Sequence, residues 1–321
     1  MFRRWLLTVL AVGAGFLAQG CTTNPATGER ILTLLPRSEE IRIGLEAAPQ
    51  FTAEFGGATP SPALQDYVTR IGRAMIVHTE ADYPTLPWEF TLLDSDTINA
   101  FALPGGKVFI SRGLAEQMTN EAQMAGVIGH EIGHVTAQHS NQRISNTAMF
   151  NLILAGAAVS VAVADSDSDY RRYGQVAVPA LAIGGNLVLL KFGRDEELQA
   201  DMLGVRYMTH VGYDPRGARE VMELLQSLSG GPRQPEFLST HPDPASRINQ
   251  IQRLMQGEYA HTQNNPQYQL HAQRFEQEFL RVVKGLPPPV HKHSRRVLNG
   301  EALAALGPPS SWCAHCAVGE E

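Results

Sequence analysis

The stretch His130-Glu131-Ile132-Gly133-His134 decides how this chain is interpreted. Its two histidines are four residues apart, so on a helix they lie on one face and can bind one metal ion. A catalytic zinc ion takes three protein ligands and leaves a fourth position for water. The glutamate beside the first histidine can reach that water and accept its proton. The motif therefore predicts His130 and His134 as metal ligands and Glu131 as a general base.

The residues around this stretch favour a helix. Asn120 can cap its start, with Gln123 three residues on, and we expect the helix to continue to about His139. Its apolar face is marked by Met124, Ile128, Ile132 and Val135. Glycine disfavours a helix, so its repeated use at Gly126, Gly129 and Gly133 indicates that another element packs closely there. The alternative is a surface helix whose two histidines bind no metal.

A third ligand is available in Glu197-Leu198-Gln199-Ala200-Asp201, on a helix predicted to begin near Arg194. Glu197 and Asp201 share a helix face because they are four residues apart. One carboxylate can bind the metal while the other accepts the remaining N–H of a ligand histidine. Glu196 competes for the ligand role, and on the residues alone the acidic run can also be a solvated helix face.

The residues farther from the motif predict an α+β fold with a small sheet. Helices are expected at residues 38–55, 63–78, 215–228, 244–254 and 270–284. Strands are expected at residues 88–93, 99–103 and 108–111, and Pro104-Gly105-Gly106 predicts a hairpin between the last two. The apolar runs 148–164 and 176–190 are short for membrane spans, so we expect a helical hairpin near the site, with a membrane hairpin as the alternative.

Several further motifs occur in a consistent order along the chain. They are residues 87–91, 99–106, 129–135, 194–201 and 212–215, followed by Thr240-His241-Pro242 with Arg247. Together they resemble the HtpX and CAAX-prenyl-protease family of zinc metallopeptidases, most closely its periplasmic lipoprotein branch, typified by BepA and LoiP. The resemblance covers residues 38–255. Unlike BepA, this chain has no clear C-terminal array of helical repeats, which puts partner recognition by such an array in doubt.

The resemblance implies a helix-rich zincin domain of the gluzincin type. It implies one zinc ion on His130, His134 and Glu197, with Glu131 as the base. It favours Glu197 over its neighbour Glu196 as the third ligand. It also implies that Asp201 is the partner of a ligand histidine.

Three further assignments follow from the resemblance. An edge strand would bind the substrate backbone, and Asn99, Ala100 and Phe101 match it, although Asn99 can also be a turn or strand cap. His241 would lie near the metal, where it either donates to the oxyanion or occupies the open metal position and switches the enzyme off. His139 matches a recurrent position, but its offset of five residues from His134 predicts that it turns away, in a structural role.

The N-terminus has the layout of an export signal. A basic start, Met1-Phe2-Arg3-Arg4, precedes an uncharged, mainly apolar run at residues 5–18 and then Gly20-Cys21. The junction resembles a bacterial lipobox, so we expect residues 1–20 to be a lipoprotein signal peptide and Cys21 to be acylated. The alternative is a secreted protein with a free Cys21. Residues 21–37 are expected to be an extended tether.

The remaining segments complete the expected organisation. The metallopeptidase domain spans residues 38–258, and residues 259–321 form a partly disordered tail. In an exported chain, Cys313 and Cys316 favour a local disulfide over a redox site.

The chain is therefore expected to hydrolyse polypeptides, namely misfolded or misassembled envelope proteins. The alternative is a chaperone that binds peptides and rarely cleaves them. The net charge of -6 gives no reason to expect nucleic acid. We expect a lipid anchor on the periplasmic side of the envelope, and the outer membrane because Thr22, rather than Asp, follows Cys21.

Overall fold

A three-stranded sheet and the helices around it form the centre of the computed structural model, which describes residues 21–80, 83–150, 191–231 and 235–289. Strands β3 (Glu89–Leu93), β4 (Ala100–Leu103) and β5 (Lys107–Ser111) follow the order β3-β5-β4. β3 is parallel to β5, and β4 pairs with β5 as the predicted antiparallel hairpin, with Ala100 opposite Ile110. β4 is therefore an edge strand of this sheet.

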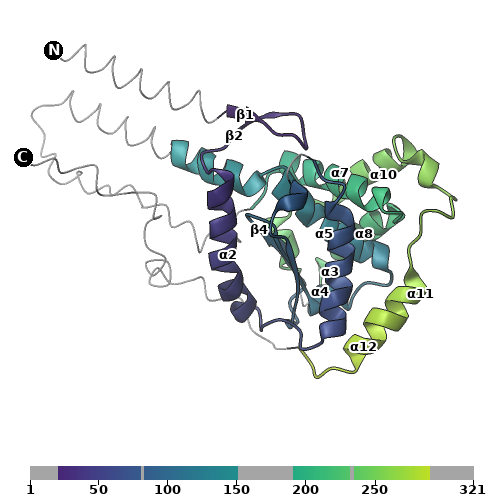
Figure 1. The fold of residues 1–321 in the computed structure, drawn as a ribbon. Coiled ribbons are helices and arrows are strands. Elements are labelled where there is room, and N and C mark those ends of the chain that lie inside the picture. The colour runs from purple at the N-terminus through teal and green to yellow at the C-terminus, as the bar shows by residue number, and fades with distance from the viewer. Residues whose placement is uncertain (1–20, 81–82, 151–190, 232–234, 290–321) are drawn as a thin grey trace, which may run out of the picture.

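Two helices precede the sheet and pack against it (Figure 1). The helix α3 (Pro62–Ile76) begins where the Ser61 side chain accepts from the Leu64 backbone, and it contacts β3. The helix α2 (Arg37–Glu54) begins one residue before the predicted Ser38 start, after Pro36. Phe51 of α2 and the following Phe55 pack against Phe101 of β4, which completes a second hydrophobic cluster.

The helical layer beside the sheet contains α5 (Glu121–Thr136), which carries the metal motif, and α7 (Arg194–His210). Asn120 caps α5 as predicted, by accepting from the Gln123 backbone. The expectation of close packing at the glycines is also confirmed. A Cβ on Gly129 would lie 3.0 Å from the Gly204 carbonyl oxygen, and one on Gly133 would lie 2.7 Å from that of Ala200. Small residues thus bring α5 and α7 together along the segment that carries the ligands.

The remaining elements surround this pair. They are α4 (Arg112–Ala115), α8 (Arg216–Leu228), α9 (Phe237–Thr240) and α10 (Pro244–Gln256), with short 3-10 turns at Tyr83–Thr85 and Ala260–Thr262. α8 packs on α5, and α10 packs on α7 and α8. The helices predicted at residues 215–228 and 244–254 are therefore present, with ends that differ by one or two residues.

The helix with the motif ends earlier than predicted. α5 stops at Thr136, residues 137–138 form a turn, and a new helix occupies residues 139–150. Gln138 has a left-handed backbone with φ of 58°. The prediction that one helix runs to His139 is therefore wrong, because a left-handed residue ends the helix and changes the direction of the chain after it.

The N-terminal segment also differs from the expected tether. β1 (Cys21–Thr23) and β2 (Arg30–Leu32) pair antiparallel, with Cys21 opposite Leu32. Between them Asn24 is fully buried and donates to the Thr136 carbonyl at 2.9 Å, at the end of α5. Its own side-chain oxygen accepts from the Ala26 backbone, which closes the turn. This hairpin is fixed to the C-terminal end of α5.

The packed body extends past residue 258. The predicted helix at 270–284 is present as α11 (Ala272–Phe275), a π-helical turn (Glu276–Leu280) and α12 (Arg281–Lys284). It runs beside α3 (Figure 1), where Phe275 and Phe279 are fully buried against Tyr67. The side chain of Arg274 donates to buried Glu121 at 2.7 Å, so an ion pair joins this helix to the start of α5.

Some expectations lie outside the described residues. They are the signal peptide at 1–20, most of the helical hairpin at 148–190, and the tail beyond 289 with Cys313 and Cys316. Within the described part of the chain, no helix has both the length and the apolar composition that a membrane crossing requires.

Candidate metal centre

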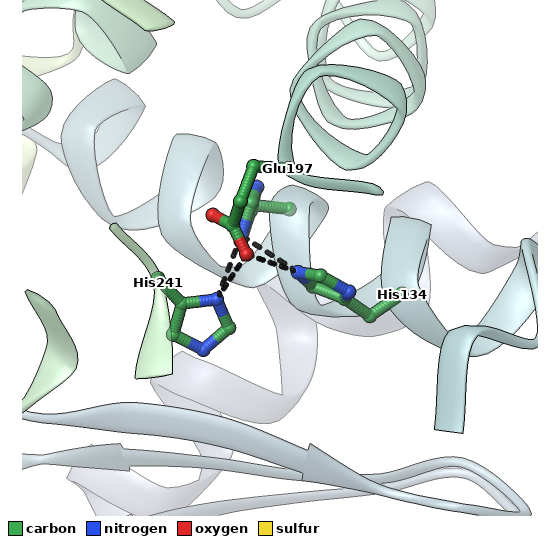
Figure 2. A group of neighbouring side chains, drawn as sticks. His134, Glu197 and His241 are labelled. Atoms are coloured by element: carbon green, nitrogen blue, oxygen red, sulfur yellow. Dashed lines mark hydrogen bonds and ion pairs between the residues drawn. The ribbon is translucent and has the colours of Figure 1, made fainter. Parts of the chain in front are cut away.

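Four side chains from three parts of the fold converge on one point. His130 and His134 come from α5, Glu197 from the first turn of α7, and His241 from the residue after α9. Figure 2 shows His134, Glu197 and His241 pointing toward one another. Each offers one ligand atom, and these atoms all lie within 4.8 Å of one another. All four residues are buried. The predicted ligands are therefore together, and His241 joins them.

The spacing of these atoms fits a tetrahedral metal ion. Zinc bonds of 2.0–2.1 Å to nitrogen and oxygen would place the corners of a tetrahedron about 3.3 Å apart. The Nε2 atoms of His130 and His134 are 3.0 Å apart, and His134 Nε2 is 3.4 Å from Glu197 Oε1. His241 Nδ1 lies 3.3 Å from His130 Nε2 and 3.0 Å from Glu197 Oε1. Two histidine nitrogens facing each other share one proton at most, so a cation satisfies this set better than hydrogen bonds do.

Asp201 and Arg247 both contact His130. Asp201 Oδ1 lies 2.9 Å from His130 Nδ1, so an Nδ1–H donates to the carboxylate and Nε2 keeps its lone pair. Arg247 is fully buried and donates to Asp201 from Nε and Nη2, at 2.8 and 2.7 Å. Its Nη1 also lies 2.7 Å from Glu197 Oε2. One arginine thus holds both carboxylates of α7 in place.

The electrostatics keep these carboxylates ionised. Burial raises the pKa of Glu197, but the charges of His241 and Arg247 outweigh it and hold that pKa well below its usual value. Burial likewise opposes ionisation of Asp201, and Arg247 lowers its pKa overall. Glu196 is excluded from the cluster because its carboxylate accepts from Arg143 and from the Gly193 backbone.

Glu131 lies beside these four side chains. Its Oε1 atom lies 3.7 Å from His241 Nε2 and has no hydrogen-bond partner among the described residues. Burial raises the pKa of Glu131, although the nearby histidines oppose this. A buried carboxylate with an open lone pair and a raised proton affinity suits proton transfer from water near neutral pH.

Aromatic rings that the sequence did not identify enclose the site. The Phe192 ring stacks on His134 with centroids 4.0 Å apart, and Phe237 stacks on His241 at 4.3 Å. The Phe192 backbone donates to Thr240, and the Phe237 backbone donates to Ile98, just before β4. Neither phenylalanine belongs to a recognised motif, and both are far from α5 in sequence, so the sequence did not predict their contacts with the site histidines.

His139 is the site residue that the sequence misplaced. Because α5 breaks before it, its Nδ1 returns to within 2.8 Å of His134 Nδ1 rather than turning away. His139 is buried, and burial lowers its pKa. The helix end at Gln138 has neither glycine nor asparagine, the residues that commonly follow a helix, so the sequence did not predict it.

The edge strand β4 passes close to the metal centre. Ala102, His134 and Gln138 line one small recess. Ser111 donates to the Asn99 carbonyl, and hydrogen bonds alternate along an antiparallel pair, so Asn99 and Phe101 direct their backbone groups to β5. Ala100 and Ala102 then face the free edge. Of the three predicted residues, Ala100 directs its backbone groups to this edge but is itself only 1% exposed, whereas the neighbouring Ala102 is partly exposed there.

Comparison with known proteins agrees with this site. The model of peptidase family M48 matches residues 62–255. The beta-barrel assembly-enhancing protease of Escherichia coli (strain K12) is 28% identical over 252 residues, which cover 76% of this chain and 50% of that protein. The mitochondrial metalloendopeptidase OMA1 of Schizosaccharomyces pombe is 29% identical over 254 residues, 78% of this chain and 71% of that protein. The chain spans about half the length of the Escherichia coli relative.

Proposed function

Since the chain belongs to peptidase family M48, which confirms the resemblance carried by its motifs, we propose that it is a zinc-dependent endopeptidase. In this proposal one zinc ion binds His130, His134 and Glu197, and Glu131 is the general base. The observation that carries it is the tetrahedral spacing of buried donor atoms around one point, with the open carboxylate of Glu131 beside them.

The bound zinc would polarise the scissile carbonyl and acidify the attacking water. Glu131 takes the proton from that water and returns it to the leaving amine, a role that its raised pKa supports. Asp201 would hold His130 through a buried hydrogen bond to its Nδ1, and Arg247 would hold Asp201 through hydrogen bonds and Glu197 through a buried ion pair.

The substrate class we propose is extended polypeptide. A peptide that adds to the free edge of β4 would form backbone hydrogen bonds with Ala100 and Ala102, and these make few demands on side chains. Such loose selection suits misfolded or misassembled proteins of the cell envelope. The name of the Escherichia coli relative, which refers to β-barrel assembly, supports this context.

The proposed location is the periplasmic side of the envelope, with an acylated Cys21 as the anchor. Cys21 is exposed at the start of β1, which is compatible with acylation. Thr22 after the cysteine supports the outer membrane as the destination.

A second candidate is a peptide-binding chaperone that rarely cleaves. The same free edge of β4 would serve it. Glu131 discriminates between the two, because a protein that only binds peptides has no use for a buried base beside a metal.

The test is hydrolysis of casein by the purified full chain, with its zinc content measured in parallel. Glu131→Gln should abolish cleavage and keep the zinc, because it removes the base and no ligand, while His134→Ala should lose both. Glu196→Gln is the matched control, since that nearby carboxylate binds Arg143 instead. Cleavage by Glu131→Gln at the wild-type rate would refute the mechanism.

A further inference from the structure

The helix break at Gln138 places a third histidine of this segment behind the ligand His134. The new helix at residues 139–150 begins with His139, whose ring meets that of His134 edge-on, with centroids 4.9 Å apart. The two Nδ1 atoms are 2.8 Å apart. This is a hydrogen-bond distance, so one of the two nitrogens donates and the other accepts.

Gln199 decides which nitrogen donates. Its Oε1 lies 3.2 Å from His139 Nε2, and a carbonyl oxygen can only accept, so His139 carries its proton on Nε2. A neutral imidazole has one N–H, which leaves His139 Nδ1 as an acceptor. His134 must then donate from Nδ1, and its Nε2 lone pair is free to face the metal centre.

We propose that His139 is a positioning residue, which holds His134 in the Nδ1–H form and in the orientation that presents Nε2 to the metal, with Gln199 fixing His139 in turn. The inference rests on the metal centre proposed above. The two ligand histidines then have different hydrogen-bond acceptors. His130 donates to the ionised Asp201, whereas His134 donates to the neutral pair His139 and Gln199.

There is a physical reason for an uncharged acceptor behind His134. Glu131, Glu197 and Asp201 already place three buried carboxylates at the centre, and Arg247 pairs with the last two. A further buried carboxylate behind His134 would need another cation. His139 and Gln199 supply an acceptor without adding charge. The sharp turn at Gln138 is what allows a residue five positions after His134 to reach it.

The first experiment measures zinc affinity of the purified full chain by competition with a chromophoric chelator. His139→Phe keeps a ring of similar size and removes the acceptor, so affinity should fall about 10- to 100-fold. His139→Asn restores an acceptor near the Nδ1 position and should recover most of the loss. His210→Phe is the matched control, because that exposed histidine stacks on His78 and bonds to the Arg206 carbonyl, outside the metal centre.

Gln199 supplies a second test that does not depend on packing at position 139. Gln199→Glu keeps an acceptor and should preserve zinc affinity, whereas Gln199→Lys offers only donors and should reduce it. The opposite order would mean that Gln199 donates to His139, and it would overturn the proposal.

The tautomer itself can be observed in the metal-free protein labelled with ¹⁵N-histidine. Two-bond proton–nitrogen spectra should show His134 protonated on Nδ1 in the wild type and on Nε2, or on both in exchange, in His139→Phe. An Nε2–H form in the wild type would overturn the proposal, as would equal zinc affinity in wild type, His139→Phe and His139→Asn. Wild-type protein that binds no zinc would instead refute the proposed function.

Discussion

The Nδ1 atom of His241 lies 3.0 Å from Oε1 of Glu197, closer to this ligand carboxylate than His134 Nε2, which is 3.4 Å away. His241 therefore stands among the metal donors and not at a distance from them. Of the two roles considered for His241, oxyanion donor and capping ligand, this geometry favours the capping role. The Phe237 ring stacks on His241, and the Phe237 backbone donates to Ile98, so His241 is connected to the start of the edge strand.

We expect His241→Ala to raise basal peptide turnover and self-cleavage while zinc content stays at one ion per chain. The reason is that removal of a capping imidazole opens the fourth metal position to water. Zinc content and peptide turnover of the variant provide the measurement. A fall in rate of about 10²- to 10³-fold with unchanged metal affinity would instead assign His241 to the oxyanion. Unchanged values for both would remove it from the site.

The free edge of β4 can be tested by a substitution at Ala102. Ala102→Pro removes an outward N–H without taking a bond from the β4–β5 ladder, so KM for an unfolded substrate should rise with little change in melting temperature. Steady-state kinetics on a fluorescent peptide would measure it. Ala102→Ser is the control, because it keeps the N–H. Equal KM values in the two variants would show that substrates do not add to this edge.

Cys21→Ser should block acylation and leave an unprocessed or soluble species. The basis is the basic start, the apolar run and the Gly20-Cys21 junction, together with the exposure of Cys21. Mass spectrometry of the mature N-terminus is the measurement. A terminus at any residue other than an acylated Cys21 would contradict the lipoprotein assignment.

Glu121→Gln should lower the free energy of unfolding by about 2 kcal/mol at pH 7. Burial raises the pKa of Glu121, but Arg274, Tyr213 and Tyr67 outweigh it, so the net pKa is lowered. A lowered carboxyl pKa contributes stability above the unfolded pKa and loses it as pH falls through the folded value. The difference between wild type and Glu121→Gln should thus shrink as the pH drops below about 4.3.

Denaturant unfolding at pH 7 and at successively lower pH would measure the effect of Glu121. Glu278→Gln is the control, because its ion pair with Arg70 is about half exposed on both sides and contributes little. A difference between wild type and Glu121→Gln that does not change with pH would show that the carboxylate charge is not what fastens the C-terminal helix.

Local patterns predicted the parts of this fold that depend on neighbours in sequence. The cap at Asn120, the hairpin around Gly105 and the spacing of His130 and His134 all act within a few residues. The choice of Glu197 required the family motifs, because the residues alone left Glu196 as a competitor for the ligand role.

Other parts escaped prediction because long-range contacts determine them. Asn24 bonds to Thr136, 112 residues away, and Arg274 bonds to Glu121, 153 residues away. A polar side chain gives no sign in sequence of such a distant partner. The left-handed Gln138 escaped for another reason, since glutamine has no special preference for that conformation.

The N-terminal hairpin limits how far the metal centre can lie from the proposed anchor at Cys21. A flexible tether over residues 21–37 would have allowed the candidate metal centre to sample up to about 55 Å above a membrane. The bond from Asn24 to Thr136 shortens the free chain to Cys21–Thr23, about 10 Å of strand. With Cys21 as the proposed anchor, this centre would stay at one height over the lipid surface. Its substrates would then be chains that stall or unfold within that thin layer, whatever their sequence.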